Sequence, residues 1–168
     1  MGGSPREAIV VDSKNSQPIS NLFNIARKKA SINGTVKRSE VLRAVFGIVY
    51  EQIPPTDNSE ILVERLIGTY LAWDDRKMNL DRFIENRVGV CRHYALACGV
   101  LLELFKKNGN IFGTPSIDRS TTFEGAHAWC RYTGSCGEVR ILDVMQNFFG
   151  SIQEAESEGR WDYRRPED

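Results

Sequence analysis

The chain has 168 residues, of which 41% are hydrophobic and 26% are charged, and its 22 basic side chains balance 22 acidic ones. This length and composition are typical of one soluble globular domain. The neutral balance, without a basic stripe interleaved with aromatic residues, argues against a nucleic-acid partner. No apolar run approaches the roughly eighteen residues of a membrane-spanning helix, so no membrane partner is expected either.

Cysteine usage and the first residues bear on the cellular location. Residues 1–7 lack the basic and then apolar pattern of a secretory signal. The four cysteines form no C-x-x-C pair and the chain has only two histidines, so we expect neither a disulfide framework nor a structural zinc site. A reduced, cytoplasmic setting is predicted, with secretion as an effector as the alternative, and the oligomeric state stays open.

The first two-thirds of the chain is predicted to be helical. A polar stretch over residues 1–17 is expected to be a flexible arm. After it, apolar residues recur at helical spacing and are interrupted by glycine and proline pairs. The last helical run is apolar nearly all round, which is typical of a central buried helix. Five helices are expected, over residues 19–30, 35–52, 59–73, 81–87 and 91–107.

After Gly109 the pattern changes to short runs rich in β-branched and aromatic residues. We expect strands over residues 111–117, 126–133 and 138–145, the last two joined as a hairpin by residues 134–137. Helices followed by strands predict a single α+β domain over residues 18–150. A charged tail over residues 151–168 follows, whose aromatic residues Trp161 and Tyr163 could pack back onto the domain.

Cys91 lies at the start of the predicted helix over residues 91–107, directly after Gly89 and Val90. The first turn of a helix lowers the pKa of a cysteine without a metal, because its dipole and unpaired N–H groups favour the thiolate. The same N–H groups can bind the oxyanion of a tetrahedral intermediate. This position predicts a nucleophile; the alternative is a buried structural cysteine.

His127 and Asp143 lie on the two strands of the expected hairpin. If residues 134–137 form the turn, His127 lies opposite Val144 and within one residue of Asp143; a loop one residue shorter pairs it with Asp143 directly. Opposite side chains lie about 5 Å apart at Cβ, which suits a carboxylate that orients an imidazole. We predict His127 as the base and Asp143 as the orienting acid. The alternative is a histidine bonded to backbone and an aspartate that ends a strand.

Three aromatic or amide side chains are candidates for supporting roles. Trp129 shares a strand face with His127 and is expected to form a shelf against the imidazole or the substrate. A second oxyanion donor should come from before Cys91 in the chain. The indole N–H of Trp73 and the side chain of Gln52 are the candidates for that donor.

The remaining thiols and the second histidine receive no catalytic role. His93 follows Cys91 by two residues, so on a helix its side chain points about 200° away, and it is expected at the surface or behind the site. Cys98 is expected in the core. Cys130 and Cys136 flank the hairpin turn and are interpreted as structural or incidental.

Three motifs in chain order resemble the core of the transglutaminase-like superfamily, a branch of the papain-like cysteine enzymes. The resemblance covers about residues 80 to 145. Its motifs are Gly89-Val90-Cys91-Arg92-x-Tyr94-Ala95, then His127-Ala128-Trp129, then Leu142-Asp143.

The resemblance implies a fold and a set of roles. It implies a papain-like core, in which a cysteine-bearing central helix packs on an antiparallel sheet that carries the histidine and the aspartate on adjacent strands. Carried over, Cys91 is the nucleophile, His127 the base and Asp143 the orienting acid. His93 departs from the family, in which many members carry an acidic residue at this position. The paired cysteines of the glycopeptide-amidase branch and an acidic calcium loop are both missing from the sequence.

The predicted function is cysteine-dependent acyl transfer. Cys91 would form a thioester from a protein amide or peptide bond, and water (as in a protease or deamidase) or an amine (as in a cross-linking enzyme) would complete the reaction. No cofactor and no metal are expected, and the partner is a protein or peptide substrate. Bacterial peptidases and effectors occur among the small members of the family. The alternatives are a catalytically silent binding module on the same fold and an acyltransferase that uses a thioester cofactor.

Overall fold

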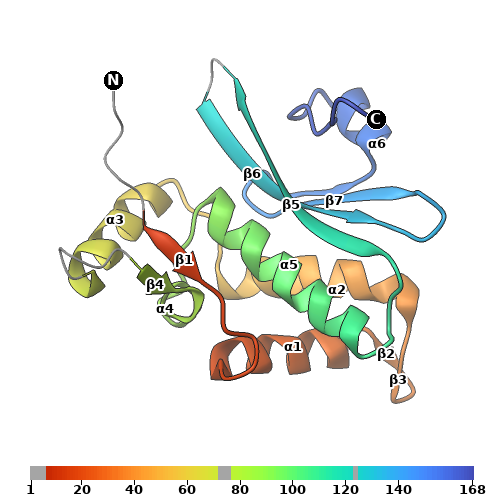
Figure 1. Ribbon diagram of the computed structural model, residues 1–168, viewed down its shortest axis with the longest axis horizontal. Helices are drawn as coiled ribbons and strands as arrows, with labels where there is room; N and C mark the ends of the chain where they lie inside the picture. Colours follow the sequence, from red (N-terminus) through yellow and green to blue (C-terminus); the bar gives the residue numbers. More distant parts are fainter. Residues whose placement is uncertain (1–6, 72–76, 123–124) are drawn as a thin grey trace.

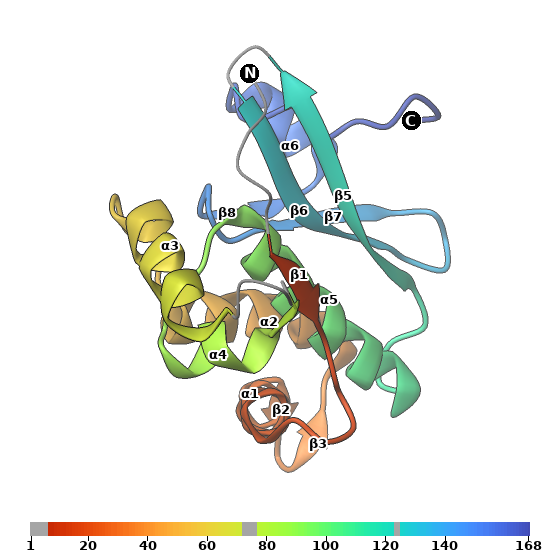
Figure 2. The ribbon, with the colours of Figure 1, turned by 60° about the vertical axis from the view of Figure 1, so that its left-hand side comes forward.

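A helical layer and an antiparallel sheet make up most of the molecule, and the C-terminal segment covers the side of the sheet that faces away from the helices (Figures 1 and 2). The computed structural model describes residues 7–71, 77–122 and 125–168. The predicted α+β class is confirmed.

The five predicted helices are present, and all but the last, over residues 91–107, have shifted ends. α2 begins later than expected because residues before it form a hairpin of two short strands, β2 (Ser31–Ile32) and β3 (Thr35–Val36), turned by Asn33 and Gly34 with positive φ. The helices are α1 (Gln17–Lys29), α2 (Arg38–Gln52), α3 (Ser59–Tyr70), α4 (Leu80–Glu85), α5 (Cys91–Lys107) and a sixth that was not predicted, α6 (Ile152–Ser157).

The main sheet has four antiparallel strands in the order β5-β6-β7-β8. They are β5 (Thr114–Thr122), β6 (Gly125–Thr133), β7 (Val139–Asp143) and β8 (Phe148–Gly150). A separate parallel pair joins β1 (Ala8–Val10) to β4 (Lys77–Asn79). The stretch expected to be a flexible arm therefore contains a strand that is paired far along the chain.

The register of the β6–β7 hairpin differs by one residue from the prediction. Thr133 pairs with Val139 rather than with Glu138. Glu138 still belongs to the loop, because its carbonyl oxygen accepts a hydrogen bond of 2.8 Å from Gly134 N–H. Gly137 allows this longer turn with a φ of 87°, which favours glycine. The predicted four-residue turn is therefore wrong.

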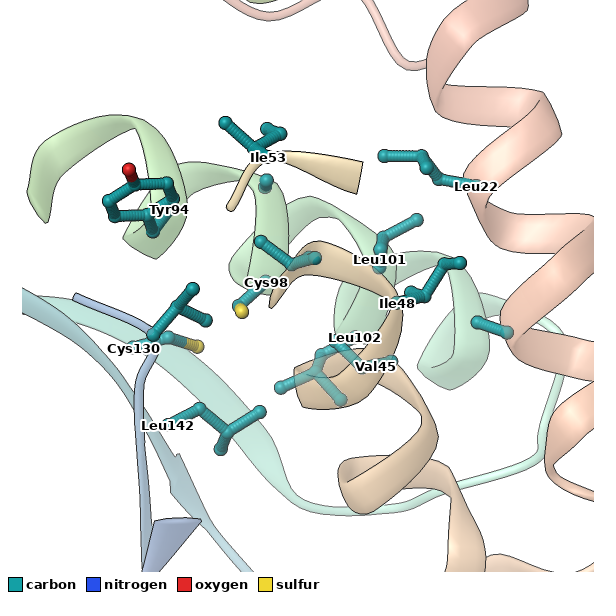
Figure 3. Packing of buried hydrophobic residues seen from close by; sticks show 14 of the residues in the cluster. Leu22, Val45, Ile48, Ile53, Tyr94, Cys98, Leu101, Leu102, Cys130 and Leu142 are labelled. Atoms are coloured by element: carbon teal, nitrogen blue, oxygen red, sulfur yellow. The ribbon is translucent and has the colours of Figure 1, made fainter. Parts of the chain in front are cut away.

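The main core lies between α5, the helices α1 and α2, and the inner face of the sheet (Figure 3). α5 contacts both layers, which explains its nearly continuous apolar sequence. The buried residues labelled in Figure 3 include Leu22, Val45, Ile48, Cys98, Leu101, Leu102, Cys130 and Leu142.

A second, smaller core lies between the outer face of the sheet and the C-terminal segment. Tyr163 is only 1% exposed there. Two ion pairs hold the segment to the sheet, one from Arg165 to Asp118 on β5 and one from Arg131 on β6 to Asp168. The buried residues of this cluster are Trp129, Ile141, Phe148, Ile152, Ala155 and Tyr163. Residues 151–168, although charged, form a structural layer of the molecule.

Within residues 7–71, 77–122 and 125–168, none of the helices has the length and apolar character needed to cross a bilayer.

Candidate active site

Cys91 is the first residue of α5 and is partly exposed. Val90 precedes it in an extended conformation, and Tyr94 Oη donates a 2.6 Å hydrogen bond to the Gly89 carbonyl oxygen, which fixes the entry of the chain into the helix. Gly89 is needed here because of crowding rather than because of its φ. A Cβ on Gly89 would lie 3.0 Å from the Tyr94 ring and 3.1 Å from Ile53.

His127 and Asp143 are diagonal neighbours on one face of the sheet. The ladder pairs Cys130 with Leu142, so Asp143 lies across from Trp129, two residues along β6 from His127. Diagonal positions are within reach of polar side chains, and His127 Nε2 lies 2.5 Å from Asp143 Oδ2. The one-residue correction of the register is what brings the two side chains to the same face.

The Cys91 thiol and His127 lie close enough for each to shift the pKa of the other. Burial works against charge on both groups, but the interactions with His127 and with the Ala128 backbone N–H lower the pKa of the Cys91 thiol. For His127, burial is likewise outweighed by interactions with Asp143 and Cys91, which raise its pKa to about 9. Since Asp143 occupies Nε2, Nδ1 is the nitrogen left for the thiol. These opposite shifts favour a thiolate–imidazolium pair.

The C-terminal segment encloses this pair. Tyr163 Oη donates a 2.8 Å hydrogen bond to Asp143 Oδ2. The Trp161 ring lies 5.0 Å from the His127 ring, centroid to centroid, and its indole N–H donates to Ser120 Oγ at 2.9 Å. His127 is therefore only 6% exposed. Burial by itself raises the pKa of Tyr163, and the carboxylate of Asp143 raises it further, so the phenol stays protonated and donates.

The predicted supporting residues have different outcomes. Trp129 lies beside His127, with ring centroids 6.0 Å apart, and is buried. Gln52 ends α2 and, among the described residues, makes no hydrogen bond with Cys91, His127 or Asp143. Trp73 lies outside the described residues. Among the candidates that the structure describes, His127 interacts with Cys91, Asp143 and Trp129.

His93 and the other cysteines lie away from the thiol. Cys98 and Cys130 are buried in the core, Cys136 is exposed, and all four cysteines are free. His93 is fully buried, so of its two expected positions the one at the surface is wrong and the one behind the site agrees with the structure. Its ring packs 3.8 Å, centroid to centroid, from Phe83 of α4.

The sequence motifs did not identify the residues of the C-terminal segment that contact the site. Trp161 and Tyr163 are the only aromatic residues in an otherwise charged stretch, and this contrast was the available signal. No sequence pattern pointed to Ser120, the hydrogen-bond partner of Trp161. Its place beside the site follows only from its pairing with His127 in the β5–β6 ladder.

Two hollows lie outside the site, and neither is lined by Cys91, His127 or Asp143. A polar hollow of about 430 Å³ is lined by Gln146, Trp161 and the loop residues 158–160. A more apolar hollow of about 410 Å³ lies between α5 and β5, with Leu96, Val100 and Ile117 in its walls. The first shares Trp161 with the environment of His127, and the Trp161 ring lies between the two.

Among the described residues, no group of three or more His, Cys, Asp and Glu side chains is arranged to hold a metal ion. Comparison of the chain with protein-family profiles, with curated proteins and with solved structures gave no match.

Proposed function

We propose that this protein is a cysteine-dependent acyl-transfer enzyme of the transglutaminase-like type, which forms a thioester on Cys91 from a protein amide or peptide bond. The observation that carries the proposal is the contact of Cys91 with His127 and of His127 with Asp143. The three residues are far apart in the chain, and each occupies the position that its role requires. The cysteine starts a helix, and the other two lie on adjacent strands.

In the first half of the reaction the Cys91 thiolate attacks the carbonyl carbon of the substrate. A carbon–sulfur bond forms, and the carbonyl electrons move to oxygen, where the backbone N–H groups of the first turn of α5 can stabilise them. His127 then gives its proton to the amide nitrogen. The carbon–nitrogen bond breaks, and ammonia or an amine leaves behind a thioester.

In the second half the neutral His127 takes a proton from the acceptor. The acceptor oxygen or nitrogen attacks the thioester carbonyl carbon, the carbon–sulfur bond breaks, and the thiolate returns. With water as the acceptor the result is proteolysis or deamidation. With an amine as the acceptor it is cross-linking. Asp143 keeps the imidazole oriented through both halves and stabilises its cationic form.

The order of elements supports the transglutaminase-like resemblance and a papain-like core. α5 carries the nucleophile at its start and packs on an antiparallel sheet, and β6 and β7 carry the base and the acid. In this proposal the partner is a protein or peptide, no cofactor takes part, and the location is the cytoplasm, with secretion as an effector as the alternative.

A catalytically silent binding module is the second candidate function. The coverage of His127 favours it, because the imidazole is 6% exposed and lies against Trp161. A substrate must therefore reach the pair through the partly exposed thiol or displace Trp161. An enzyme and a silent module differ in whether the thiol is ionised and reactive at neutral pH.

The test is the rate at which iodoacetamide labels Cys91 between pH 4 and 9, in the wild type and in His127→Ala. Mass spectrometry of peptides separates Cys91 from the exposed Cys136, which is labelled in the same sample and serves as an internal reference. For an ion-paired thiolate, Cys91 labelling in the wild type stays fast well below about pH 8 and falls at least about tenfold at pH 6 in His127→Ala.

Labelling of Cys91 only above about pH 8, and equally in both proteins, would overturn the enzymatic proposal and leave the binding module. If the thiol is reactive, release of ammonia and incorporation of a fluorescent amine into protein substrates identify the acceptor. Cys91→Ala is the control for both assays.

A further inference from the structure

Behind the first turn of α5, on a side that the acyl-transfer chemistry does not use, three side chains form a second polar cluster. They are Glu7, Arg92 and His93. Glu7 and His93 are buried, and Arg92 is partly exposed. Polar groups buried at this depth are costly unless each is hydrogen-bonded, so the partners of each group are informative.

His93 caps the helix that carries the nucleophile. Its Nδ1 accepts a 3.1 Å hydrogen bond from the backbone N–H of Val90, the residue before Cys91. Val90 has no polar side chain, so the usual capping hydroxyl is missing at this terminus, and the imidazole supplies one of the two halves of a capping box. An Nδ1 that accepts must be unprotonated. The ring is therefore neutral, and its proton resides on Nε2.

Glu7 holds both residues that follow Cys91. Its Oε1 lies 3.1 Å from His93 Nε2 and accepts from Arg92 Nε at 2.9 Å and from Arg92 Nη2 at 2.6 Å. Burial opposes ionisation of Glu7, but these hydrogen bonds outweigh it and lower its pKa to about 2. For His93, burial outweighs the carboxylate and lowers the pKa. A neutral imidazole satisfies both of its hydrogen-bond partners, because Nε2–H can donate to the ionised carboxylate of Glu7 and Nδ1 accepts from the Val90 N–H.

The cluster is joined to the thiol through the backbone. The N–H of Arg92 helps to stabilise the Cys91 thiolate, and Val90 and Arg92 are the two neighbours of Cys91 in the chain. Glu7 comes from a remote segment that is fixed by the pairing of β1 with β4. The position of the nucleophile thus depends on a contact between residues more than eighty positions apart.

We propose that His93 and Glu7 are positioning residues for Cys91. His93 fixes the turn into α5 by accepting from Val90 N–H, and Glu7 anchors His93 and Arg92, so that the thiol meets His127 in the reactive geometry. The inference rests on the proposed function, since it assigns these residues to the same reaction. It makes the N-terminal segment part of the catalytic machinery.

The first test compares two variants by the pH profile of Cys91 labelling. In His93→Gln, the amide oxygen can accept from Val90 N–H and the amide N–H can donate to Glu7, so the profile should stay within about twofold of the wild type. In His93→Leu neither bond can form, and labelling at pH 6 relative to pH 8.5 should fall about fivefold, the size of one lost helix cap.

Val63→Ala is the control for lost stability alone. Val63 is buried in α3 and lies outside both polar clusters, so this variant is destabilised without altering the helix start. If His93→Leu has the same pH profile as Val63→Ala, while the wild type labels at low pH, the positioning role is overturned and the proposed function stands. If Cys91 of the wild type is not labelled at low pH, both the positioning role and the proposed function are overturned.

Glu7→Ala separates positioning from charge. Removal of Glu7 frees the positive charge of Arg92 beside the thiol, which by itself would favour the thiolate and speed labelling at pH 6. A positioning role predicts the opposite result, a fall of about fivefold as in His93→Leu. Faster labelling in Glu7→Ala would overturn the assignment of Glu7.

A further test of the role of His93 uses the wild type alone and does not depend on the folding of any variant. The chain has only two histidines, so imidazole nitrogen NMR reports His93 and His127 separately. His93 should be the neutral tautomer with the proton on Nε2 at pH 7, where His127 is cationic. A cationic His93 at pH 7 could not accept from Val90 N–H and would overturn the proposal.

Discussion

At the scale of single residues, Asp143 determines the state of the imidazole. Its Oδ2 faces His127 Nε2 and accepts from Tyr163 Oη, and its Oδ1 accepts from the backbone N–H of Gln146. Donors to both oxygens prevent the carboxylate from rotating. Asp143 is 1% exposed, so little water competes for it, and the imidazole keeps Nδ1 toward the thiol.

The substitution Asp143→Asn tests this arrangement at nearly constant volume. Without the carboxylate, the pKa of His127 should fall from about 9 toward its ordinary value of 6.5. Since the ion pair exists only while His127 is protonated, the pH above which Cys91 is no longer paired with an imidazolium moves down. The rate at which iodoacetamide labels Cys91 should drop by up to about tenfold at pH 8.

The measurement is the pH dependence of Cys91 labelling, read together with the nitrogen shifts of His127. Asp57→Asn, at an exposed position before α3, is the matched control. An Asp143→Asn profile that overlays the wild type would mean that the carboxylate does not support the imidazolium.

At the scale of elements, two glycines illustrate how differently the helices and the sheet tolerate a methyl group. Gly113 precedes β5, and a Cβ there would lie 2.5 Å from Tyr132 Oη and would clash with the Thr133 carbonyl oxygen. Gly47 lies inside α2, and a Cβ there would meet no atom within 4 Å.

Gly113→Ala should therefore destabilise the protein by about 1–3 kcal/mol, since the backbone of β6 must shift. Gly47→Ala should stabilise it by about 0.5–1 kcal/mol, because alanine loses less conformational entropy in a helix. Urea unfolding of both variants gives the two changes. Equal changes in the free energy of unfolding would show that the approach of Gly113 to β6 is not tight.

The elements that could be predicted are those with a local signal. α5 begins and ends at the predicted residues because its apolar run starts after Gly89 and ends at Asn108-Gly109. β5 was predicted too early, since its second half, residues 118–122, is polar and carries no alternation. The short strands β1, β4 and β8 are stabilised by pairing with other strands, β1 with the remote β4 and β8 with its neighbour β7. A local sequence pattern does not encode such pairing.

At the scale of the whole molecule, the sheet is covered on both faces. α5 and its neighbours cover the inner face, and residues 151–168 cover the outer face around Tyr163. The Tyr163 ring stacks on Phe148 with centroids 5.5 Å apart and meets the edge of Trp129 at 5.1 Å. The same side chain thus packs the second core and donates to Asp143.

Two substitutions separate these roles of Tyr163. Tyr163→Phe keeps the ring and removes one hydrogen bond, so stability should fall by about 1 kcal/mol. Tyr163→Ala leaves a cavity under α6 and should cost about 3–5 kcal/mol. Chemical denaturation measures both. Similar costs for the two variants would mean that the hydroxyl, rather than the packing, is the main contribution.

The candidate catalytic residues were predictable to the extent that each motif carries its own context. Cys91 follows a glycine at a helix start, and His127 and Asp143 lie on neighbouring strands. Their alignment was not predictable, because one extra residue in the turn before Val139 decides which face Asp143 occupies. Glu7 has no local signal for the site and enters it only through the tertiary fold, and Tyr163 was marked only as an aromatic residue in a charged stretch.

The outer layer of the sheet also sets an order of events during synthesis. Cys91, His127 and Asp143 all leave the ribosome before Trp161 and Tyr163. A nascent chain that has reached residue 150 contains Cys91, His127 and Asp143, but the carboxylate of Asp143 lacks its tyrosine donor and the outer sheet face is bare. The layer that buries Asp143 and covers His127 is therefore added only after the three residues have been made.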